Sequence, residues 1–443
     1  MKVSASLKFA KSLIFPKTEK RSSARRSFFG ALICIALSII PLIVVISIST
    51  GMINGMTERI IGLSSNHLGA YISTSYKNVQ TSQEFIKLAD EIKNIEGILN
   101  AYPEIQSSSL ALNKNIRTGI EIRAVKNDIF SSNSAFRDFF EILDGSFSEF
   151  EKSGGKNAVI GKRIAEILDI KVGDSFRIIT TRKIGERFVP KLTTFNVSAI
   201  VSSGYQELDQ FWVFIPLETA YSFLSLSNSN FIISCETEDA FSPSLVRIQN
   251  NLRSFFGGYA NVYRWDQIHS AEFENFSSTK VMLVFVMMLI VLVASINISS
   301  AIIMLVIERK KEIAILKSIG ASPKGITLSF LITGMSCGIG GVLIGLPIGI
   351  ILTIFSNQIL SGLEHFMNFF VKIFYFIKKM PVSEENFVKL LNPAYYLQSI
   401  PITIPFSQIL WICFFTIILS LIVSIIPSVK AGKEKPLEIL RKN

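Results

Sequence analysis

The chain has 443 residues, of which 49% are hydrophobic and only 18% charged, a balance too apolar for an ordinary soluble protein. Its net charge is +11, but the charge is unevenly spread: residues 1–27 carry eight basic side chains and one acidic, whereas residues 51–280 carry 23 basic and 26 acidic. A basic excess confined to short segments beside apolar runs indicates cytoplasmic flanks of membrane helices. This distribution argues against nucleic acid as a partner and predicts an integral membrane protein.

The first elements in chain order are a basic segment and a membrane helix. Residues 1–27 mix lysines with apolar side chains and suit a helix on the cytoplasmic membrane surface. Residues 28–50 are long and apolar enough to span a bilayer. No Ala-x-Ala site follows them, so we expect an uncleaved anchor, transmembrane helix 1, that continues past the bilayer surface.

Residues 51–280 predict a large extracytoplasmic α+β domain. Residues 84–94 have helical spacing, and residues 120–125 alternate like a strand. Two further strands, at 175–181 and 194–202, flank a polar excursion that we expect to be too long for a two-residue turn. Cys235 is the domain's one cysteine, so no disulfide can form within the domain, which is expected to fold on its apolar core.

Three more membrane helices are predicted in the second half, at residues 281–307, 326–355 and 409–427, with both termini cytoplasmic. Residues 308–325 are a charged cytoplasmic helix, ended by Gly320 and followed by a new helix that Ser322 caps. Residues 356–408 form a short external loop with an amphipathic interfacial helix, and residues 428–443 a cytoplasmic tail. Gly341, Gly345 and Gly349 have the spacing that lets membrane helices approach closely.

The sequence predicts no catalytic residue, no metal site and no cofactor bound by this chain. Its three histidines, His67, His269 and His365, are far apart, which disfavours a zinc site. The predicted second, third and fourth spans contain no ionisable residue, which disfavours ion-coupled transport. A charged cytoplasmic helix without an energy source of its own indicates a separate ATPase partner, which would carry ATP and Mg²⁺.

Several strings carry a resemblance to a known family. Residues 312–322 (EIAILKSIGAS), followed by a membrane helix, resemble the coupling helix of ABC-type permeases of the MacB/FtsX superfamily, which docks on an ATPase subunit. Strings at 51–56 (GMINGM), 159–165 (VIGKRIA) and 427–431 (PSVKA) resemble, in order and spacing, the lipoprotein-releasing permeases LolC and LolE. The sequence does not separate a LolC-like from a LolE-like role, or from a single permease that does both.

The resemblance implies a non-catalytic permease subunit in the bacterial inner membrane. Its implied partners are a cytoplasmic ABC ATPase dimer, a second permease (the same chain or another), lipoprotein substrates and a periplasmic lipoprotein carrier. Two alternatives remain open: a MacB-like mechanotransmission exporter, and an FtsX-like regulator of a cell-wall hydrolase. The absence of an ATPase on this chain weighs against the MacB-like exporter. The large size of the external domain weighs against the FtsX-like regulator.

The resemblance also implies three sites. Each site also has a plainer alternative: a charged loop for the ATPase-coupling residues, a solvated basic hairpin for the carrier-binding hook, and ordinary helix packing for the lipid path. The ATPase-coupling residues would be Glu308, Lys311, Glu312, Ile315, Leu316, Ile319 and Gly320. A carrier-binding hook would consist of Arg182, Lys183, Ile184, Gly185, Glu186, Arg187, Phe188, Val189 and Pro190. A lipid path shared with the second span would be lined by Ile46, Ile48, Met52 and Met56, since flexible apolar side chains adapt to irregular ligands.

Overall fold

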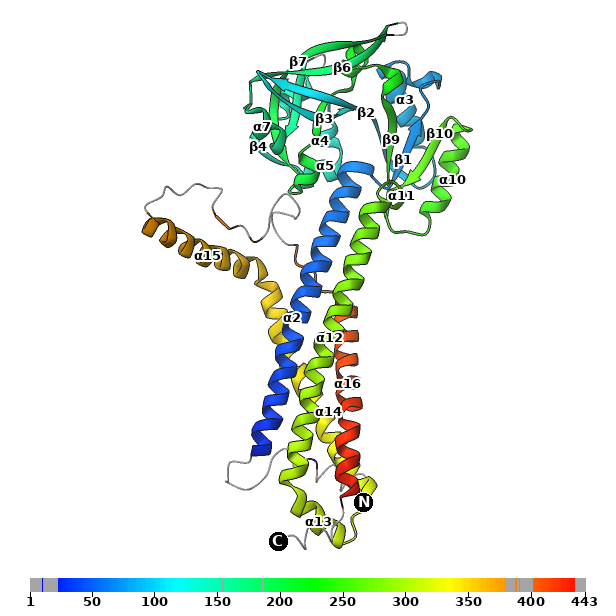
Figure 1. The fold of residues 1–443 in the computed structure, drawn as a ribbon. Coiled ribbons are helices and arrows are strands. Elements are labelled where there is room, and N and C mark those ends of the chain that lie inside the picture. Colours follow the sequence, from blue (N-terminus) through cyan, green and yellow to red (C-terminus); the bar gives the residue numbers. More distant parts are fainter. Residues whose placement is uncertain are drawn as a thin grey trace. The chain divides into compact units, whose positions relative to one another are not determined.

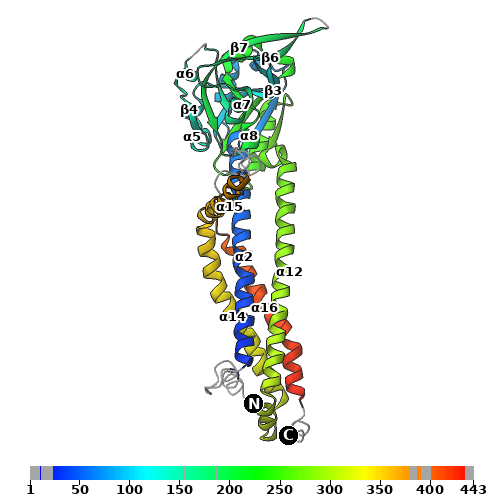
Figure 2. The ribbon, with the colours of Figure 1, turned by 60° about the vertical axis from the view of Figure 1, so that its left-hand side comes forward.

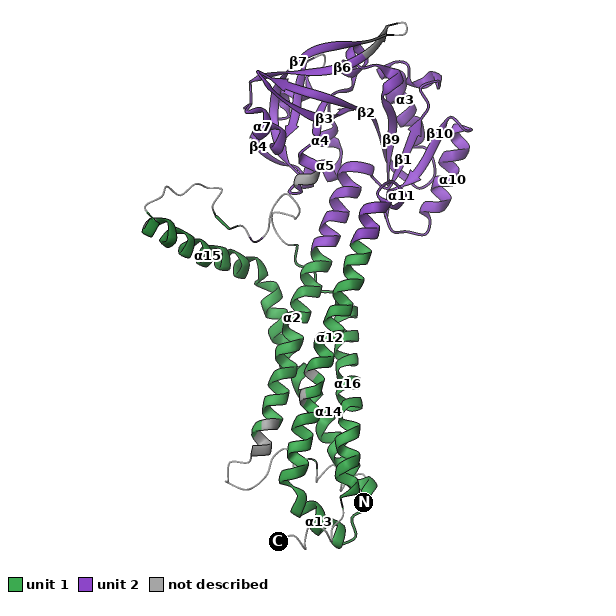
Figure 3. Cartoon of the chain, in the orientation of Figure 1, with its two compact units in different colours: residues 1–51, 276–388, 400–443 green, residues 52–275, 389–399 purple. Residues whose placement is uncertain are grey.

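A computed structural model describes most of the chain: residues 10, 23–152, 155–184, 187–378, 387–388, 390 and 401–434. The chain divides into two compact units (Figure 3). Unit 1 comprises residues 1–51, 276–388 and 400–443, and unit 2 comprises residues 52–275 and 389–399.

Unit 1 is built from long apolar helices (Figure 1). Helices satisfy their backbone polar groups internally, as a bilayer interior requires. Four of the described helices are long and apolar enough to cross a membrane, which agrees with the predicted number of spans. They are α2 (Ser23–Arg59), α12 (Ser270–Glu308), α14 (Pro323–Ile354) and α16 (Phe406–Lys433). The helices extend beyond the predicted spans: α2 continues to Arg59, and α16 extends into the predicted cytoplasmic tail.

Two shorter helices of unit 1 adjoin α14. Helix α13 (Lys310–Ser318) precedes it, and α15 (Ser356–Lys378) follows after the single residue Phe355. Because α15 begins where a membrane helix ends, chain continuity favours the predicted place at the membrane surface. Its apolar side chains, including Phe366 and Phe370, are exposed in this structure.

Glycines on α14 let two other helices, α2 and α16, pack closely against it. Figure 2 shows the ribbons of these three helices. A Cβ atom added to Gly341 would lie 2.6 Å from Ile35 Cγ2 of α2, and one added to Gly345 would lie 2.9 Å from the Ala36 carbonyl oxygen. Gly349 faces α2 in the same way. The predicted role of these three glycines in close helix packing is therefore confirmed.

A second pair of glycines on α14 faces α16. A Cβ atom on Gly334 would lie 2.6 Å from Ser424 Cβ, and one on Gly338 would lie 2.8 Å from Ser420 Cβ. Both serines bond back to carbonyls of their own helix, so their hydroxyls are satisfied while only small side chains occupy the interface. Helix α14 thus contacts α2 and α16 through different glycines.

Unit 2 contains one ten-stranded mixed sheet, in the order β10-β1-β9-β2-β3-β8-β5-β7-β4, with β6 paired to β2 and β7. The pairs β3–β8 and β5–β7 are parallel, and the other pairs are antiparallel. The strands are β1 (Leu68–Ile72), β2 (Ile98–Asn113), β3 (Ile116–Val125), β4 (Glu141–Gly145), β5 (Asn157–Gly161), β6 (Ser175–Ile184), β7 (Arg187–Ser202), β8 (Trp212–Pro216), β9 (Asn230–Thr237) and β10 (Ala260–Arg264).

Short helices connect these strands or lead into and out of the sheet. They are η1 (Ile60–Ser65), η2 (Lys77–Val79), α3 (Ser82–Ile92), α4 (Ile129–Ser132), α5 (Ser134–Phe139), α6 (Ser148–Glu151), α7 (Lys162–Leu168), α8 (Gln206–Asp209), α9 (Leu217–Phe223), η3 (Leu226–Asn228), α10 (Leu245–Phe256) and α11 (Trp265–Ile268). The predicted α+β character of the domain agrees with this arrangement. Thr81 caps α3 by accepting the N–H of Glu84 at 3.3 Å, as a threonine at this position commonly does.

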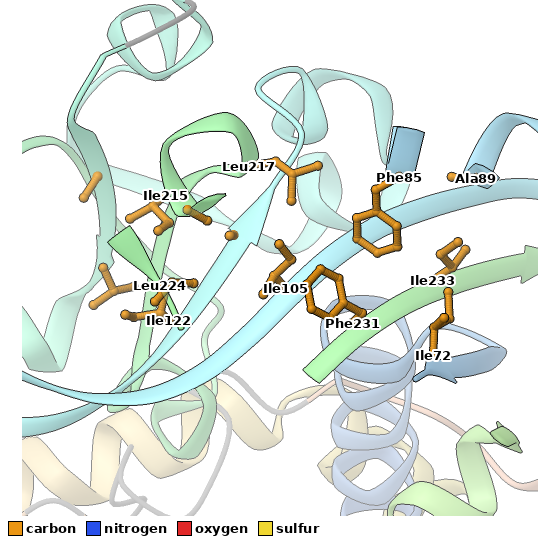
Figure 4. Close-up of a cluster of buried hydrophobic side chains, with 14 of the residues drawn as sticks. Ile72, Phe85, Ala89, Ile105, Ile122, Ile215, Leu217, Leu224, Phe231 and Ile233 are labelled. Carbon is orange, nitrogen blue, oxygen red and sulfur yellow. The ribbon is translucent and has the colours of Figure 1, made fainter. Parts of the chain in front are cut away.

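The main core of unit 2 lies between the sheet and its helices (Figure 4). Helix α3 contributes a buried stripe that includes Phe85 and Ala89, and the Phe85 ring meets Phe231 of β9 edge to face at 5.5 Å. Cys235 is buried in the same cluster as a free thiol. Burial in apolar surroundings raises the pKa of Cys235 to about 12, so its thiol remains protonated.

Strands β1 and β10 connect unit 2 to its two long helices. Strand β1 follows η1 and α2, whereas β10 leads through α11 into α12. The two strands pair antiparallel, with Leu68 opposite Arg264. The chain therefore enters and leaves the sheet on neighbouring strands.

Candidate functional site

The charged helix predicted at residues 308–325 is α13, and its predicted end at Gly320 is confirmed. Gly320 has a φ of +100°, which a residue without Cβ adopts readily. Its N–H donates to the Lys317 carbonyl at 3.0 Å, and the N–H of Ala321 donates to the Leu316 carbonyl at 2.9 Å. This pair of bonds is a Schellman motif. Ser322 then caps α14 by accepting the N–H of Gly325 at 3.3 Å.

Lysines attach α13 to the end of α16. Lys317 Nζ donates to the carbonyl oxygens of Gly432 at 2.6 Å and Glu434 at 2.5 Å, and Lys310 Nζ lies 3.3 Å from the Glu434 carboxylate. The last carbonyls of a helix have no partner within it, so a lysine placed there satisfies them. Sequence reasoning missed both lysines because their partners lie at the far end of the chain.

The apolar side chains of α13 divide between the bundle and the surface. Ile313 and Ala314 are buried, Leu316 is half-buried, and Ile315 and Ile319 are 51% and 80% exposed. Of the predicted apolar face, Ile315 and Ile319 are therefore the accessible part.

The predicted polar residues of the coupling site lie near the start of α13. Glu308 is the last residue of α12, whereas Lys311 and Glu312 are exposed in the first turn of α13. Glu312 forms an ion pair with Arg309, the residue that separates the two helices. The structure thus places the predicted coupling residues in one continuous segment that joins α12 to α14.

The predicted hook is the end of a β-ribbon, so the expectation of a turn longer than two residues is wrong. Strands β6 and β7 pair continuously from Ser175 opposite Asn196 to Ile184 opposite Arg187. Gly185 and Glu186 lie between these ends, outside the described residues. Pro190 lies within the ladder opposite Thr181, a position that proline tolerates on an edge strand.

The ribbon extends beyond the rest of the sheet (Figure 1). Strand β2 pairs with β6 at residues 177–179, and β5 pairs with β7 from residue 196 onward. Among the described residues, 180–184 and 187–191 therefore pair only with each other. Near this end Val189 is 42% exposed, whereas the side chains of residues 182–188 lie outside the described part of the structure.

The base of the ribbon is fixed to α9. Lys191 Nζ donates to the carbonyl oxygen of Ser222 at 2.9 Å, and the Thr180 hydroxyl lies 3.5 Å from the Phe223 carbonyl oxygen. These bonds join both ribbon strands to the end of one helix. Lys191 therefore lies at the base of the ribbon, where it fixes β7 to α9.

The predicted lipid-path residues are mostly covered. Ile46 is buried between α2 and α12, where it clusters with Leu42, Met287 and Val291. The other three lie further along α2: Ile48 is half-buried, and Met52 and Met56 are buried. Ile46 thus packs against α12, and its role in a lipid path stays a prediction.

An open apolar groove of about 500 Å³ lies between α2 and α12. Leu37 on α2 and Val293 on α12 are each 61% exposed along it. The groove does not include the four predicted lipid-path residues. Its lining consists of Cys34, Leu37, Ser38, Val286, Leu289, Ile290 and Val293.

Two family models match successive parts of the chain. The model for the MacB-like periplasmic core domain matches residues 28–247, and the model for the FtsX-like permease C-terminal region matches residues 284–436. The first match runs from α2 into α10, and the second contains α13, α14 and α16. Together with the four long apolar helices, these matches define an ABC-type permease that carries a MacB-like periplasmic domain.

Curated relatives match over nearly the whole chain. The lipoprotein-releasing system transmembrane protein LolE of Haemophilus influenzae is 25% identical over 421 residues, covering 92% of each chain. LolC of Neisseria meningitidis is 24% identical over 419 residues, again covering 92% of each chain. The chain belongs to the LolC/LolE family of the MacB/FtsX superfamily.

Solved structures resemble the chain more weakly. The periplasmic region of MacB from Actinobacillus actinomycetemcomitans is 14% identical, covers 48% of this chain and 94% of its own, and has a TM-score of 0.31. The extracellular domain of the ABC-type transporter YknZ is 16% identical, covers 45% of this chain and 99% of its own, and has a TM-score of 0.29. The family assignment rests on the sequence matches.

Proposed function

We propose that this chain is the permease subunit of an ABC transporter that extracts lipoproteins from the outer leaflet of the bacterial inner membrane and passes them to a periplasmic carrier. The observation that carries the proposal is the match to LolE and LolC relatives over 92% of both chains. In this arrangement unit 2 is periplasmic, and α13 and both termini are cytoplasmic. A second permease, identical or related, completes the membrane part.

Extraction requires an energy source because a lipid anchor is held strongly by the bilayer. Each buried CH₂ contributes about 0.8 kcal/mol, so the acyl chains of a lipoprotein together cost on the order of tens of kcal/mol to expose. The energy comes from ATP, bound with Mg²⁺ on a separate cytoplasmic ATPase dimer. This chain binds no cofactor and catalyses no reaction itself.

The ATPase docks on α13, where Ile315 and Ile319 are exposed beside charged residues. Lys317 and Lys310 connect α13 to the end of α16, so a movement of the docked helix reaches a second membrane helix directly. Acyl chains pass along α2 and α12, which meet around Ile46 and form an apolar groove nearby.

The carrier binds the β6–β7 ribbon. The ribbon projects from the sheet and exposes the apolar side chain of Val189 in a segment rich in arginine and lysine. Basic residues steer an encounter, while exposed apolar side chains supply affinity. The carrier itself must offer an apolar cavity, because it receives acyl chains that water excludes.

A reconstituted transfer assay tests the proposal. The chain, its ATPase and its second permease are placed in proteoliposomes that contain a labelled triacylated lipoprotein, and soluble carrier is added outside. We expect label to appear on the carrier with ATP, and not with a non-hydrolysable analogue or without carrier. ATP hydrolysis without lipoprotein transfer would contradict the proposal, and activation of a cell-wall hydrolase by the same complex would favour a regulator instead.

A further inference from the structure

A buried ion pair in unit 2 binds the end of the helix formed by α2 and η1. Arg123 of β3 is 2% exposed and forms a two-pronged ion pair with Glu104 of β2, with Nε–Oε1 and Nη2–Oε2 distances of 2.6 and 2.7 Å. Its third nitrogen, Nη1, donates to the backbone carbonyl oxygen of Leu63 at 2.5 Å. Leu63 lies in η1, the π-helical turn that follows α2. One guanidinium thus connects two strands and a helix end.

The surroundings of Arg123 fix its position. The guanidinium carbon lies 4.3 Å from the ring centre of Trp212 and 5.2 Å from that of Phe214, both on β8, an arrangement in which aromatic faces attract a cation. The Leu63 side chain is fully buried in the same aromatic cluster. The Leu63 carbonyl is among the last of its helix, which lack helical partners, and Arg123 supplies the missing donor.

Two neighbouring contacts hold the same helix end. Arg59 Nε donates to the carbonyl oxygen of Ser203 at 2.7 Å, and the Arg59 guanidinium carbon lies 5.2 Å from the ring centre of Phe139. Gly62 allows η1 to approach α5 closely, since an added Cβ would lie 2.7 Å from Ala135 Cβ. The helix end is therefore held from more than one direction.

Stability alone does not account for Arg123. A buried ion pair gains little over apolar residues of similar volume, because both charges lose their hydration. The planar fork of arginine does offer geometry, since it bonds a carboxylate and a further acceptor in fixed directions. Here those acceptors belong to the sheet and to the helix end.

The contact also lies on a short route to the ribbon. Glu104 belongs to β2, and six residues further along the same strand Leu110 pairs with Ile179 of β6. Strand β6 then continues into the projecting β6–β7 ribbon. The bonds from Leu63 through Arg123 to Glu104 thus lead to a strand that supports the ribbon.

We propose that Arg123 is a positioning residue that couples movement of the α2–η1 helix to the sheet and its ribbon, so that ATP hydrolysis is converted into lipoprotein transfer. This inference rests on the proposed function. Arg123 contacts neither ATP nor lipoprotein in this role; it acts by fixing Leu63 to Glu104.

The bonds that join Leu63 to Glu104 through Arg123 are called the bridge. Two variants remove the bridge while limiting damage to the fold. Arg123→Met combined with Glu104→Met removes both charges of the ion pair together, so neither partner is left without the other. Arg123→Lys keeps a cation beside Glu104 but lacks the fork that also reaches Leu63. The matched control is Arg163→Met with Glu166→Met, which removes an exposed ion pair within α7.

We expect both bridge variants to assemble and hydrolyse ATP like wild type, while lipoprotein transferred per ATP hydrolysed falls by about tenfold or more, the size expected from losing one hydrogen bond to a charged group. The control retains the wild-type ratio. A wild-type ratio in either assembled bridge variant overturns the inference. If the double variant Arg123→Met, Glu104→Met does not assemble, the transfer ratio of Arg123→Lys alone tests the inference.

A distance measurement separates this inference from the proposed function. Spin labels on Asn54 of α2 and Arg117 of β3, both exposed, are introduced after the four native cysteines are replaced. We expect a narrow distance distribution in the wild-type background and a broad one in both bridge variants. An equally narrow distribution in the variants overturns the inference. Failure of wild type to transfer lipoprotein refutes the proposed function, and the label distances still test the bridge.

Discussion

Replacing Gly334 with alanine is expected to force α14 and α16 apart. The new Cβ would lie 2.0 Å from Ser424 Oγ, 2.6 Å from Ser424 Cβ and 2.9 Å from Ile302 Cδ1. Rotating the serine hydroxyl relieves the first contact only, because its Cβ is fixed to the helix backbone. Ordinary contact begins at 3.4 Å, so the helices must separate by about 0.8 Å. Overpacking of this kind destabilises a core by about 1–3 kcal/mol.

The reciprocal change at Ser424 should restore the lost stability. Ser424→Gly removes both serine atoms that the alanine would meet, so the double variant exchanges the positions of glycine and the small residue. Glycine in a helix interior costs about 0.5–1 kcal/mol relative to alanine, and in the double variant this cost on α16 is offset by the gain on α14. The double variant is therefore expected to lie close to wild type.

Unfolding of the purified full chain in mixed detergent micelles, titrated with sodium dodecyl sulfate, measures these changes. We expect Gly334→Ala to lower the free energy of unfolding by about 1–3 kcal/mol and Ser424→Gly to rescue it. The control is Gly362→Ala on α15, where an added Cβ meets no atom within 4 Å. An unchanged unfolding curve for Gly334→Ala, or a double variant less stable than the single one, would refute this account of the interface.

Three further predictions follow from the coupling helix, the ribbon and a buried histidine. Ile319→Asp places a charge on the exposed face of α13 and should abolish co-purification of the ATPase, with membrane insertion unchanged; normal co-purification would contradict docking there. Phe188→Ser with Val189→Ser should abolish carrier binding in a titration while ATP hydrolysis continues, and wild-type affinity would place the hook elsewhere. Burial lowers the pKa of His67, so the unfolded chain takes up its proton first as pH falls below about 6.5. Stability conferred by neutral His67 is therefore present above that pH and lost below it, and His67→Gln should flatten this part of the stability–pH curve.

The sequence predicted those features whose signals are local. Long apolar runs indicated the four membrane helices, because a bilayer accepts few alternatives. The end of α13 at Gly320 and the start of α14 at Ser322 followed from residue types that cap helices. The spacing of Gly341, Gly345 and Gly349 predicted close packing, although it did not show that α2 is the partner.

Features that depend on pairing between distant segments were not predicted. Glu104 and Arg123 meet because β2 and β3 are neighbouring antiparallel strands, and Leu63 reaches them only through the fold. The sequence predicts a loop at the end of the β6–β7 ribbon because a two-stranded ribbon has no buried face and so no alternating apolar pattern. The link from Lys317 to Gly432 likewise depends on how α13 and α16 meet.

The pairing of β1 with β10 makes the segment between them an exchangeable module. Leu68 and Arg264 lie opposite each other on adjacent strands, so the two ends of the inserted segment are only about 5 Å apart. A segment with adjoining ends can be excised, or replaced by another with equally close ends, without changing the spacing of the helices that flank it. Recombination at these two points can therefore exchange the segment between them for another domain, and a short turn joining residues 68 and 264 would remove the segment altogether.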